Sequence, residues 1–283
     1  MSLTPTEPTL ILSDLHLGHR ASRIKDPEQL VPVLRGSSSV IFNGDTAEMR
    51  HAIDRPVGRK FAADLARICH REGKKAFFVN GNHDPTVSHI NHLDLHQGAV
   101  LVTHGDILFL GVAPWSRAAK HYRTKHRQIL DNLGPEDFID FEKRLLATKR
   151  TTIELQMIEP ALTGERLPGL RLFIRQFWPP FRPLMIVKAW WETPGLAANL
   201  GRFFRPQARF ILVGHTHFPG AWKVGPRIVI NTGGFVPYFG ACAAIIDSKK
   251  IELRQVVSHR RQFVLGKRIA GYAIDPLRPT DRF

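Results

Sequence analysis

The stretch that decides the fold lies near the start of the chain and is Thr9-Leu10-Ile11-Leu12-Ser13-Asp14-Leu15-His16-Leu17-Gly18. Its apolar run is bounded by turn residues, which predicts a buried strand. Asp14 and His16 come directly afterwards, so a carboxylate and an imidazole are expected just past the carboxyl end of that strand. In an open α/β sheet this edge is where ligands bind. A single pair of this kind is weak evidence, and its weight depends on how the later strands end.

The later apolar runs end in the same way. Further strands are predicted at 38–42, 75–79, 99–102 and 208–213, and an amphipathic helix at 57–73. Each strand is followed within a few residues by side chains that can bind a metal ion. These candidates are Asp14, His16, Asp45, Asn82, His104, His215 and His217, with His83 beside them. A lone histidine at a strand end is usually structural, but five motifs in the same context indicate one shared site.

The types of ligand indicate which metal ions the site would hold. Carboxylate, amide and imidazole groups without a thiolate suit Mn²⁺, Fe²⁺ or Zn²⁺. Seven ligands exceed what one tetrahedral zinc accepts, and they are about right for two ions that share a carboxylate. Two metal ions about 3.5–4 Å apart can activate a water and clamp phosphoryl oxygens during in-line displacement. The residues therefore predict two divalent ions, with Mn²⁺ as the first choice, and hydrolysis of a phosphoester or phosphoanhydride.

The order of these motifs resembles that of the calcineurin-like metallophosphoesterase superfamily. The matching motifs are Asp14-x-His16, Gly44-Asp45, Gly81-Asn82-His83-Asp84, His104 and Gly214-His215-x-His217, and the resemblance covers 9–106 and 209–256. It implies an α/β fold in which a two-sheet sandwich is flanked by helices. It also implies one metal ion on Asp14, His16 and His217, a second on Asn82, His104 and His215, and Asp45 as the bridge. Asp45 and His83 would be catalytic, with His83 stabilising the phosphoryl oxygens or protonating the leaving group.

Two local features narrow the resemblance. Glu48 follows Asp45 by three residues, and Pro219 follows His217 by two. Both are similar to the UDP-2,3-diacylglucosamine hydrolases of lipid A synthesis, which split a nucleotide–lipid pyrophosphate and carry a helical lid in the interval that corresponds to 107–206. Those hydrolases typically have an arginine at the position of His83, so this chain departs from their pattern there.

The middle of the chain differs from the rest. From 107 to 206 it is basic, helical in pattern and rich in aromatic residues. We expect a phosphoesterase core over 1–106 and 207–260, a helical lid over 107–206, and a C-terminal tail over 261–283. The segments 170–178 and 184–191 combine apolar side chains, tryptophans and cations, which suits a membrane interface or an acyl-chain groove. A hydrophobic core within the insertion is the alternative. If the insertion is only a lid, its deletion should spare hydrolysis of a small ester.

The composition indicates the partners. The chain has 283 residues and a formal net charge of +15, which predicts an anionic partner such as a phosphorylated substrate, an acidic membrane surface or nucleic acid. The first residues lack the pattern of a signal peptide, and no apolar run approaches the ~18 residues of a membrane span. A cytoplasmic protein, peripheral on the inner face of the membrane, is therefore expected. No obligate protein partner is inferred.

Three functions are compatible with these patterns. We expect a metal-dependent hydrolase of a lipid-linked phosphodiester or pyrophosphate, such as UDP-2,3-diacylglucosamine. A nuclease or nucleotide phosphodiesterase is the first alternative, because the charge suits phosphate contacts and the aromatic residues suit base stacking. A peripheral membrane-binding protein with a structural metal site is the second, although such a site would not require His83. Asn231, at a strand end beside two glycines, is a further candidate for positioning the site.

Overall fold

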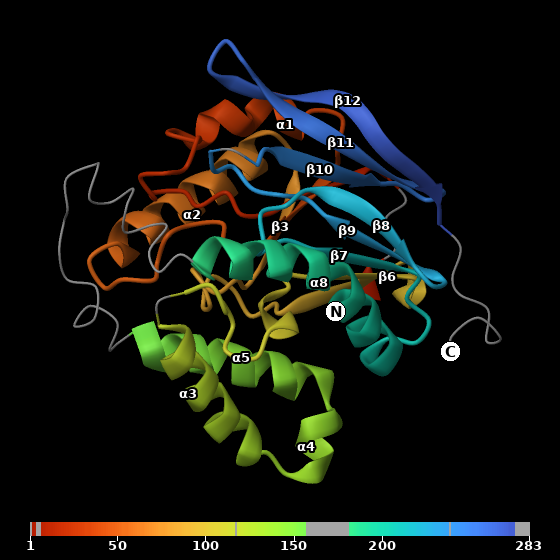
Figure 1. Ribbon diagram of the computed structural model, residues 1–283. Helices are drawn as coiled ribbons and strands as arrows, with labels where there is room; N and C mark the ends of the chain where they lie inside the picture. Colours follow the sequence, from red (N-terminus) through yellow and green to blue (C-terminus); the bar gives the residue numbers. More distant parts are fainter. Residues whose placement is uncertain (1, 4–6, 117, 157–180, 238, 275–283) are drawn as a thin grey trace.

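Two sheets packed face to face form the centre of the molecule (Figure 1). The structure is a computed structural model that describes residues 2–3, 7–116, 118–156, 181–237 and 239–274. We call the six-stranded sheet with order β1-β5-β6-β7-β9-β8 sheet A, and the six-stranded sheet with order β12-β11-β10-β2-β3-β4 sheet B. Helices cover both outer faces. The predicted α/β sandwich is confirmed.

The strands of each sheet and the helices have the following bounds. Sheet A contains β1 (Ser2–Leu3), β5 (His92–Leu95), β6 (Val100–Thr103), β7 (Phe210–Val213), β8 (Gly220–Val224) and β9 (Arg227–Asn231). Sheet B contains β2 (Thr9–Leu12), β3 (Ser39–Asn43), β4 (Lys75–Val79), β10 (Ala241–Ile246), β11 (Lys250–His259) and β12 (Gln262–Ala273). The helices are α1 (Val31–Leu34), α2 (Arg55–Arg71), α3 (Ala119–Asp131), α4 (Pro135–Ile139), α5 (Phe141–Gln156) and α8 (Phe181–Phe204). Short 3₁₀ turns lie at η1 (Pro27–Leu30), η2 (His96–Gly98) and η3 (Asp106–Leu108).

Each sheet contains a run of three parallel strands. In sheet B these are β2, β3 and β4, with Leu12 beside Phe42 and Phe42 beside Phe78. In sheet A they are β6, β7 and β9. Because the carboxyl ends of parallel strands meet at one edge of a sheet, the residues that follow these strands gather on the same side of the sandwich.

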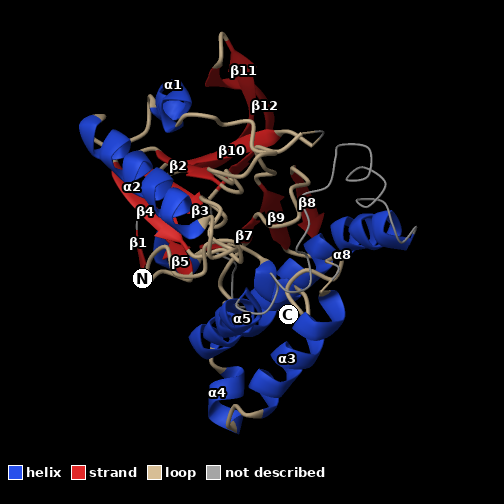
Figure 2. Cartoon of the chain, turned by 90° about the vertical axis from the view of Figure 1, so that its left-hand side faces the viewer, coloured by secondary structure: helices blue, strands red, loops and turns tan. Residues whose placement is uncertain are grey.

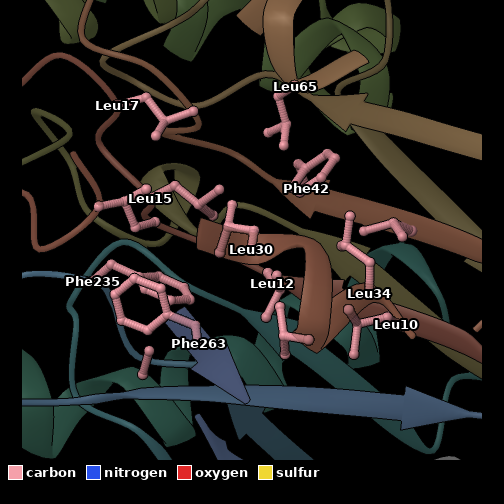
Figure 3. Packing of buried hydrophobic residues seen from close by; sticks show 14 of the residues in the cluster. Leu10, Leu12, Leu15, Leu17, Leu30, Leu34, Phe42, Leu65, Phe235 and Phe263 are labelled. Atoms are coloured by element: carbon pink, nitrogen blue, oxygen red, sulfur yellow. The ribbon is translucent and has the colours of Figure 1, made fainter. Parts of the chain in front are cut away.

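Side chains alternate along the strands and so sort into separate layers. Leu10 and Leu12 of β2 face outward and share a buried cluster with Leu34 of α1 and Leu65 of α2 (Figure 3). Ile11, between them in the sequence, faces inward and belongs to the cluster that fills the space between the sheets. The apolar run read from the sequence is therefore a central strand that is buried on both faces.

The outer face of sheet A is covered by helices from the segment that was expected to be a separate lid. Phe141 and Leu145 of α5 and Ala197 of α8 share a buried cluster with Ile211 of β7 and Val229 of β9. Figure 2 shows α3, α4 and α5 together on one side of the sheets, with α8 close to β8 and β9. Parts of 107–206 thus pack on the outer face of sheet A as a helical layer.

The C-terminal part also differs from expectation. The strands β10 and β11 form a hairpin, because they pair antiparallel across a short turn. Residues 262–273, assigned to a tail over 261–283, instead form β12 and pair with β11. This strand lies at the edge of its sheet and carries two adjacent cations, Lys267 and Arg268. Charged residues are common in edge strands, where they prevent pairing with other chains, and here they interrupt the apolar alternation. The segment 170–178 lies outside the described residues.

Candidate metal centre

The backbone turns sharply where the strands end. Five of the seven expected ligands lie in the left-handed region, where a residue other than glycine costs about 1–2 kcal/mol. They are Asp14 (φ 53°), His16 (φ 49°), Asp45 (φ 51°), His215 (φ 66°) and His217 (φ 57°). Strain of this kind persists where surrounding contacts enforce it, and it is concentrated at functional sites. Here the sharp turns aim side chains from several strands at one place.

Two glycines let the edges of the sheets approach each other. A Cβ atom on Gly44, after β3, would lie 2.3 Å from Nδ1 of His104, after β6. A Cβ atom on Gly214, after β7, would lie 2.3 Å from Oδ2 of Asp14, after β2. Each glycine follows a strand of one sheet and contacts a ligand that follows a strand of the other. Larger residues at these positions would push the two halves of the site apart.

Three of the expected ligands form the first group. The Oδ1 atom of Asp14 lies 3.1 Å from Nε2 of His217 and 3.9 Å from Nε2 of His16. The two imidazole Nε2 atoms are 3.1 Å apart. Asp14 and His16 are buried, and His217 is partly exposed. One cation could contact all three groups, as the resemblance implies for this set.

The second group is more deeply buried. Nε2 of His104 lies 3.2 Å from Oδ1 of Asn82, and the rings of His104 and His215 have centroids 5.2 Å apart. Asp45 joins this group, because its Oδ1 atom is 3.4 Å from Nε2 of His104. Possible ligand atoms of Asp45, His104 and His215 all lie within 4.8 Å of one another.

Asp45 faces both groups at once. Its Oδ1 atom is turned towards His104, and its Oδ2 atom lies 3.8 Å from Nε2 of His16. The carboxylate is buried, with only 1% of its surface exposed. Its geometry therefore fits the position between two cations that the resemblance implies for it.

Hydrogen bonds to the backbone fix which imidazole nitrogen is available. Nδ1 of His104 lies 3.0 Å from the carbonyl oxygen of Asn43, and Nε2 of His215 lies 2.9 Å from that of Val112. Because a carbonyl oxygen only accepts, these nitrogens carry the proton. Nε2 of His104 and Nδ1 of His215 remain as donors to a metal ion, in the manner usual for histidine ligands.

The electrostatics of the site favour cations. Burial lowers the pKa of His16 to about 3 and that of His215 to about 4, so both rings are neutral at pH 7 and can donate a lone pair. Burial also opposes a charge on His104, but the carboxylates of Asp45 and Asp14 outweigh it and raise the pKa of His104 to about 10. The same carboxylates would attract divalent ions, which compete with protons for imidazole. The donor set thus fits two metal ions.

His83 is held by a carboxylate that is not among the expected ligands. Its Nδ1 atom lies 2.8 Å from Oε2 of Glu48, and its Nε2 atom lies 3.9 Å from Oδ2 of Asp45. Burial disfavours the charged ring, but Glu48 and Asp45 together raise the pKa of His83. The ring is therefore oriented with Nε2 towards the site as a proton donor.

The geometry agrees with a comparison of the sequence with family models. The model of calcineurin-like phosphoesterases matches residues 7–219. This chain is a calcineurin-like phosphoesterase. Members of this family are dinuclear metal-dependent enzymes, so the chain is a metal-dependent hydrolase.

Solved structures similar to this calcineurin-like phosphoesterase have low sequence identity to it. The *Escherichia coli* phosphoesterase YfcE is 15% identical, with a TM-score of 0.42, covering 95% of this chain and 100% of its own. A dimetal phosphatase from *Danio rerio* is 11% identical, with a TM-score of 0.45, covering 95% and 99%. A predicted phosphoesterase from *Streptococcus pneumoniae* is 13% identical, with a TM-score of 0.38, covering 94% and 97%. A search of curated proteins finds no match.

Asp84 supports the phosphoesterase site in a way that the sequence did not predict. Its carboxylate is fully buried and accepts hydrogen bonds from the backbone N–H groups of Asp45, Thr46, Ala47 and Gly81, at 2.7–3.2 Å. It therefore ties the loop after β3 to the loop after β4. The sequence did offer one signal of this role: Asp84 directly follows His83 in the motif Gly81-Asn82-His83-Asp84.

Two further side chains border the site. Asn231 donates to the carbonyl oxygen of Gly214 at 2.8 Å and contacts the hydroxyl of Thr216 at 3.0 Å, so it braces the loop between β7 and the last two histidines. This is the positioning contact considered from the sequence. Trp115 lies with its ring centroid 5.1 Å from that of His215. Nothing in the sequence distinguished Trp115 from the other tryptophans.

His83→Ala is expected to lower kcat by about a hundredfold or more, the usual contribution of a general acid, while both metal ions remain bound. The measurement is kcat for an aryl phosphodiester together with the metal content of the purified protein. His70→Ala, at an exposed position in α2, is the control and should change neither value. Loss of an ion from His83→Ala would make His83 a ligand, a role that its place near His16 and Asp45 allows.

Proposed function

We propose that this enzyme hydrolyses a phosphodiester or pyrophosphate bond in a lipid-linked nucleotide, such as UDP-2,3-diacylglucosamine, at the inner surface of an acidic membrane. The observation that carries the proposal is an exposed apolar face on α8 beside the candidate metal centre. It consists of Leu184, Val187 and Trp191, which are 69%, 55% and 85% exposed. Their spacing of three and four residues places them on one side of the helix.

Trp190, directly before Trp191, connects this helix to the site. Trp190 donates its Nε1 hydrogen bond to the carbonyl oxygen of Thr216 at 2.9 Å, between the expected ligands His215 and His217. Its ring also stacks on Phe218, with centroids 4.8 Å apart. The exposed apolar face is thus anchored directly to a ligand-bearing loop. Lys188, which is also exposed, lies between the apolar residues and suits a lipid phosphate.

Two arginines support a substrate with more than one phosphate charge. Arg50 and Arg182 line the cavity of about 120 Å³ that also contains Asp45 and His83. The Nε atom of Arg182 donates to the carbonyl oxygen of Trp115 at 2.8 Å, which holds its side chain at the cavity wall. Guanidinium groups bind phosphate oxygens through paired hydrogen bonds. The two arginines could therefore bind a second phosphate group of the substrate, next to the one that is hydrolysed.

The proposed reaction divides the work among these groups. Two divalent ions bound by the seven ligands would supply a water nucleophile and neutralise phosphoryl charge. Asp45 holds the two halves of the site together, and Glu48 orients His83 so that its Nε2 can give a proton to the leaving oxygen. Arg50 and Arg182 would hold the substrate in the cavity.

Attachment to the membrane would be peripheral. In the ranges that the structure describes, no helix is long and apolar enough to cross a bilayer. The lipid interface would receive the exposed side chains of Leu184, Val187 and Trp191, and nearby cations would contact the lipid headgroups. Amphipathic helices bind membrane surfaces in this way.

With Mn²⁺ present, UDP-2,3-diacylglucosamine in mixed micelles should have a kcat/KM about tenfold or more above that of an aryl phosphodiester, because binding energy from the lipid part is used in the transition state. Single-stranded DNA is the third substrate of the same assay. Rapid DNA cleavage with no reaction of the glycolipid would replace the proposal with a nuclease. No hydrolysis of any substrate, with metal bound, would favour a membrane-binding protein with a structural metal site.

A triple variant tests the contribution of α8. Changing Leu184, Val187 and Trp191 to serine should lower kcat/KM for the glycolipid by about a thousandfold or more, because burial of each side chain contributes roughly 1.5–3 kcal/mol. The aryl phosphodiester should be hydrolysed as before. Val257→Ser with Ile269→Ser is the control, since both residues are exposed on sheet B. Equal loss for both substrates would contradict the assignment.

A further inference from the structure

Three polar side chains on α5 recur at intervals of seven residues. Glu142, Lys149 and Gln156 are separated by two helical turns each, so they lie along one side of the helix. Lys149 and Gln156 are only 3% exposed, which is unusual for such residues in a helix near the surface. Thr148, Thr151 and Thr152 are also buried, and their small size lets α5 approach its neighbours closely.

Each of the three side chains contacts the loop that follows β4. Glu142 accepts a hydrogen bond from Nδ2 of Asn91 at 2.6 Å. Lys149 donates from Nζ to the carbonyl oxygen of Asn80 at 2.7 Å. Gln156 donates from Nε2 to the carbonyl oxygen of Asn82 at 3.0 Å. The polar side of α5 therefore follows the loop from its far end to the expected metal ligand Asn82.

The contact made by Gln156 falls on one particular peptide group. The carbonyl of Asn82 belongs to the peptide that joins the expected ligand Asn82 to His83. The N–H of the same peptide, on His83, donates to Oδ1 of Asp45 at 2.8 Å. Because a peptide group is planar, hydrogen bonds at both ends fix its rotation. That rotation sets the directions in which the Asn82 amide and the His83 ring leave the backbone.

A packing role alone does not explain these contacts. An apolar residue would fill the space of Gln156, but it would leave the Asn82 carbonyl without its donor. The same side of α5 places an ammonium group on a second carbonyl of the same loop through Lys149. Gln156 acts on the peptide between the two functional residues, and Lys149 acts on the carbonyl of Asn80, two residues before Asn82. They do not contact those side chains directly.

We propose that Gln156 is a positioning residue for catalysis, which acts from α5 through the Asn82–His83 peptide. It holds the Asn82 amide towards its metal ion and the His83 ring towards the leaving group. The inference rests on the proposed roles of Asn82 and His83. It makes α5 a part of the catalytic apparatus and assigns a function to a helix that lies outside the ligand motifs.

Gln156→Met tests this with little change in volume. Its kcat for an aryl phosphodiester should fall by about tenfold to a hundredfold, the range found for groups that orient metal ligands, while KM changes less than about twofold. Thr152→Val is the matched control: Thr152 is buried on the same helix, and its hydroxyl donates only within the helix, to the carbonyl of Thr148. It should keep its kcat. Equal kcat values for Gln156→Met and Thr152→Val would overturn the proposal.

A second measurement needs no metal ion and no turnover. In the metal-free protein, hydrogen exchange of the His83 amide should be about tenfold or more faster in Gln156→Met than in the wild type or Thr152→Val, because the peptide loses one of its two constraints. Gln156→Glu, which keeps the shape but replaces the donor by an acceptor, should show the same increase. Unchanged exchange in both variants would overturn the inference. If the wild-type enzyme itself neither binds metal nor hydrolyses the ester, the proposed function fails instead.

Discussion

Asp45→Ala is expected to reduce kcat for an aryl phosphodiester by about a thousandfold, because the two ions that we propose it bridges would supply several kcal/mol of stabilisation in the transition state. Its two oxygens face the two ligand groups, Oδ1 at 3.4 Å from His104 and Oδ2 at 3.8 Å from His16. Possible ligand atoms of Asp45 lie close both to those of His16 and His83 and to those of His104 and His215.

The fold should survive this substitution. The backbone N–H of Asp45 donates to Asp84, and that hydrogen bond does not involve the side chain that is removed. The N–H of His83 loses its acceptor, which costs about 1–3 kcal/mol, less than the stability of an ordinary domain. Circular dichroism should therefore be unchanged while turnover is lost. Asp247→Ala, in an exposed turn between β10 and β11, is the control and should keep wild-type turnover. Full activity of Asp45→Ala would contradict the bridging assignment.

Lys149→Met is expected to destabilise the protein by about 3–5 kcal/mol, the usual cost of removing one partner from a buried ion pair. Nζ of Lys149 lies 2.7 Å from Oδ2 of Asp106, and the two side chains are 4% and 0% exposed. Without Lys149, the carboxylate of Asp106 would be buried and uncompensated. The measurement is urea unfolding of the metal-free protein.

A neighbouring pair on the same helix provides the control. Arg150 pairs with Glu154, but its side chain is 70% exposed, so Arg150→Met should cost less than about 1 kcal/mol. Adding Asp106→Asn to Lys149→Met should recover part of the lost stability, because the uncompensated charge is then removed. A loss below about 1 kcal/mol for Lys149→Met would show that the pair does not hold α5 to the sandwich.

This ion pair changes the expectation for the middle of the chain. If 107–206 were only a lid, its deletion would spare hydrolysis of a small ester. In the structure Lys149 contacts Asp106 and the carbonyl of Asn80, and α8 covers sheet A. Deletion would remove one layer of the sandwich together with the hydrogen bonds to the loop that bears Asn82. We therefore expect it to abolish hydrolysis of every substrate.

The strands and the ligand set could be predicted because both depend on local patterns. A buried strand is a short apolar run, and each ligand stands within a few residues of its end, as Asp45 does after β3. The structure brings six of the expected ligands together at one edge of the sandwich, and the seventh, Asn82, contacts His104 there. The roles of individual ligands remain a prediction that metal analysis must test.

The residues that the sequence did not reveal act over long separations. Lys149 and Gln156 belong to the segment 107–206, for which the sequence predicted a helical lid, and only their tertiary contacts with Asn80 and Asn82 reveal their role. Glu142, Lys149 and Gln156 follow one another at intervals of seven residues, which places them on one side of a helix. A polar side usually faces solvent, so this spacing did not identify the buried contacts. For β12, the cations of an edge strand hid the alternation.

Two divalent ions at the strand ends, with Asp45 between them, are the centre of the proposed chemistry. The number of Mn²⁺ ions bound per chain, measured by equilibrium dialysis and elemental analysis, tests this arrangement most directly. We expect two ions per chain in the wild type and at most one in Asp45→Ala. A wild-type protein that saturates at one ion, or an Asp45→Ala variant that keeps both, would contradict it.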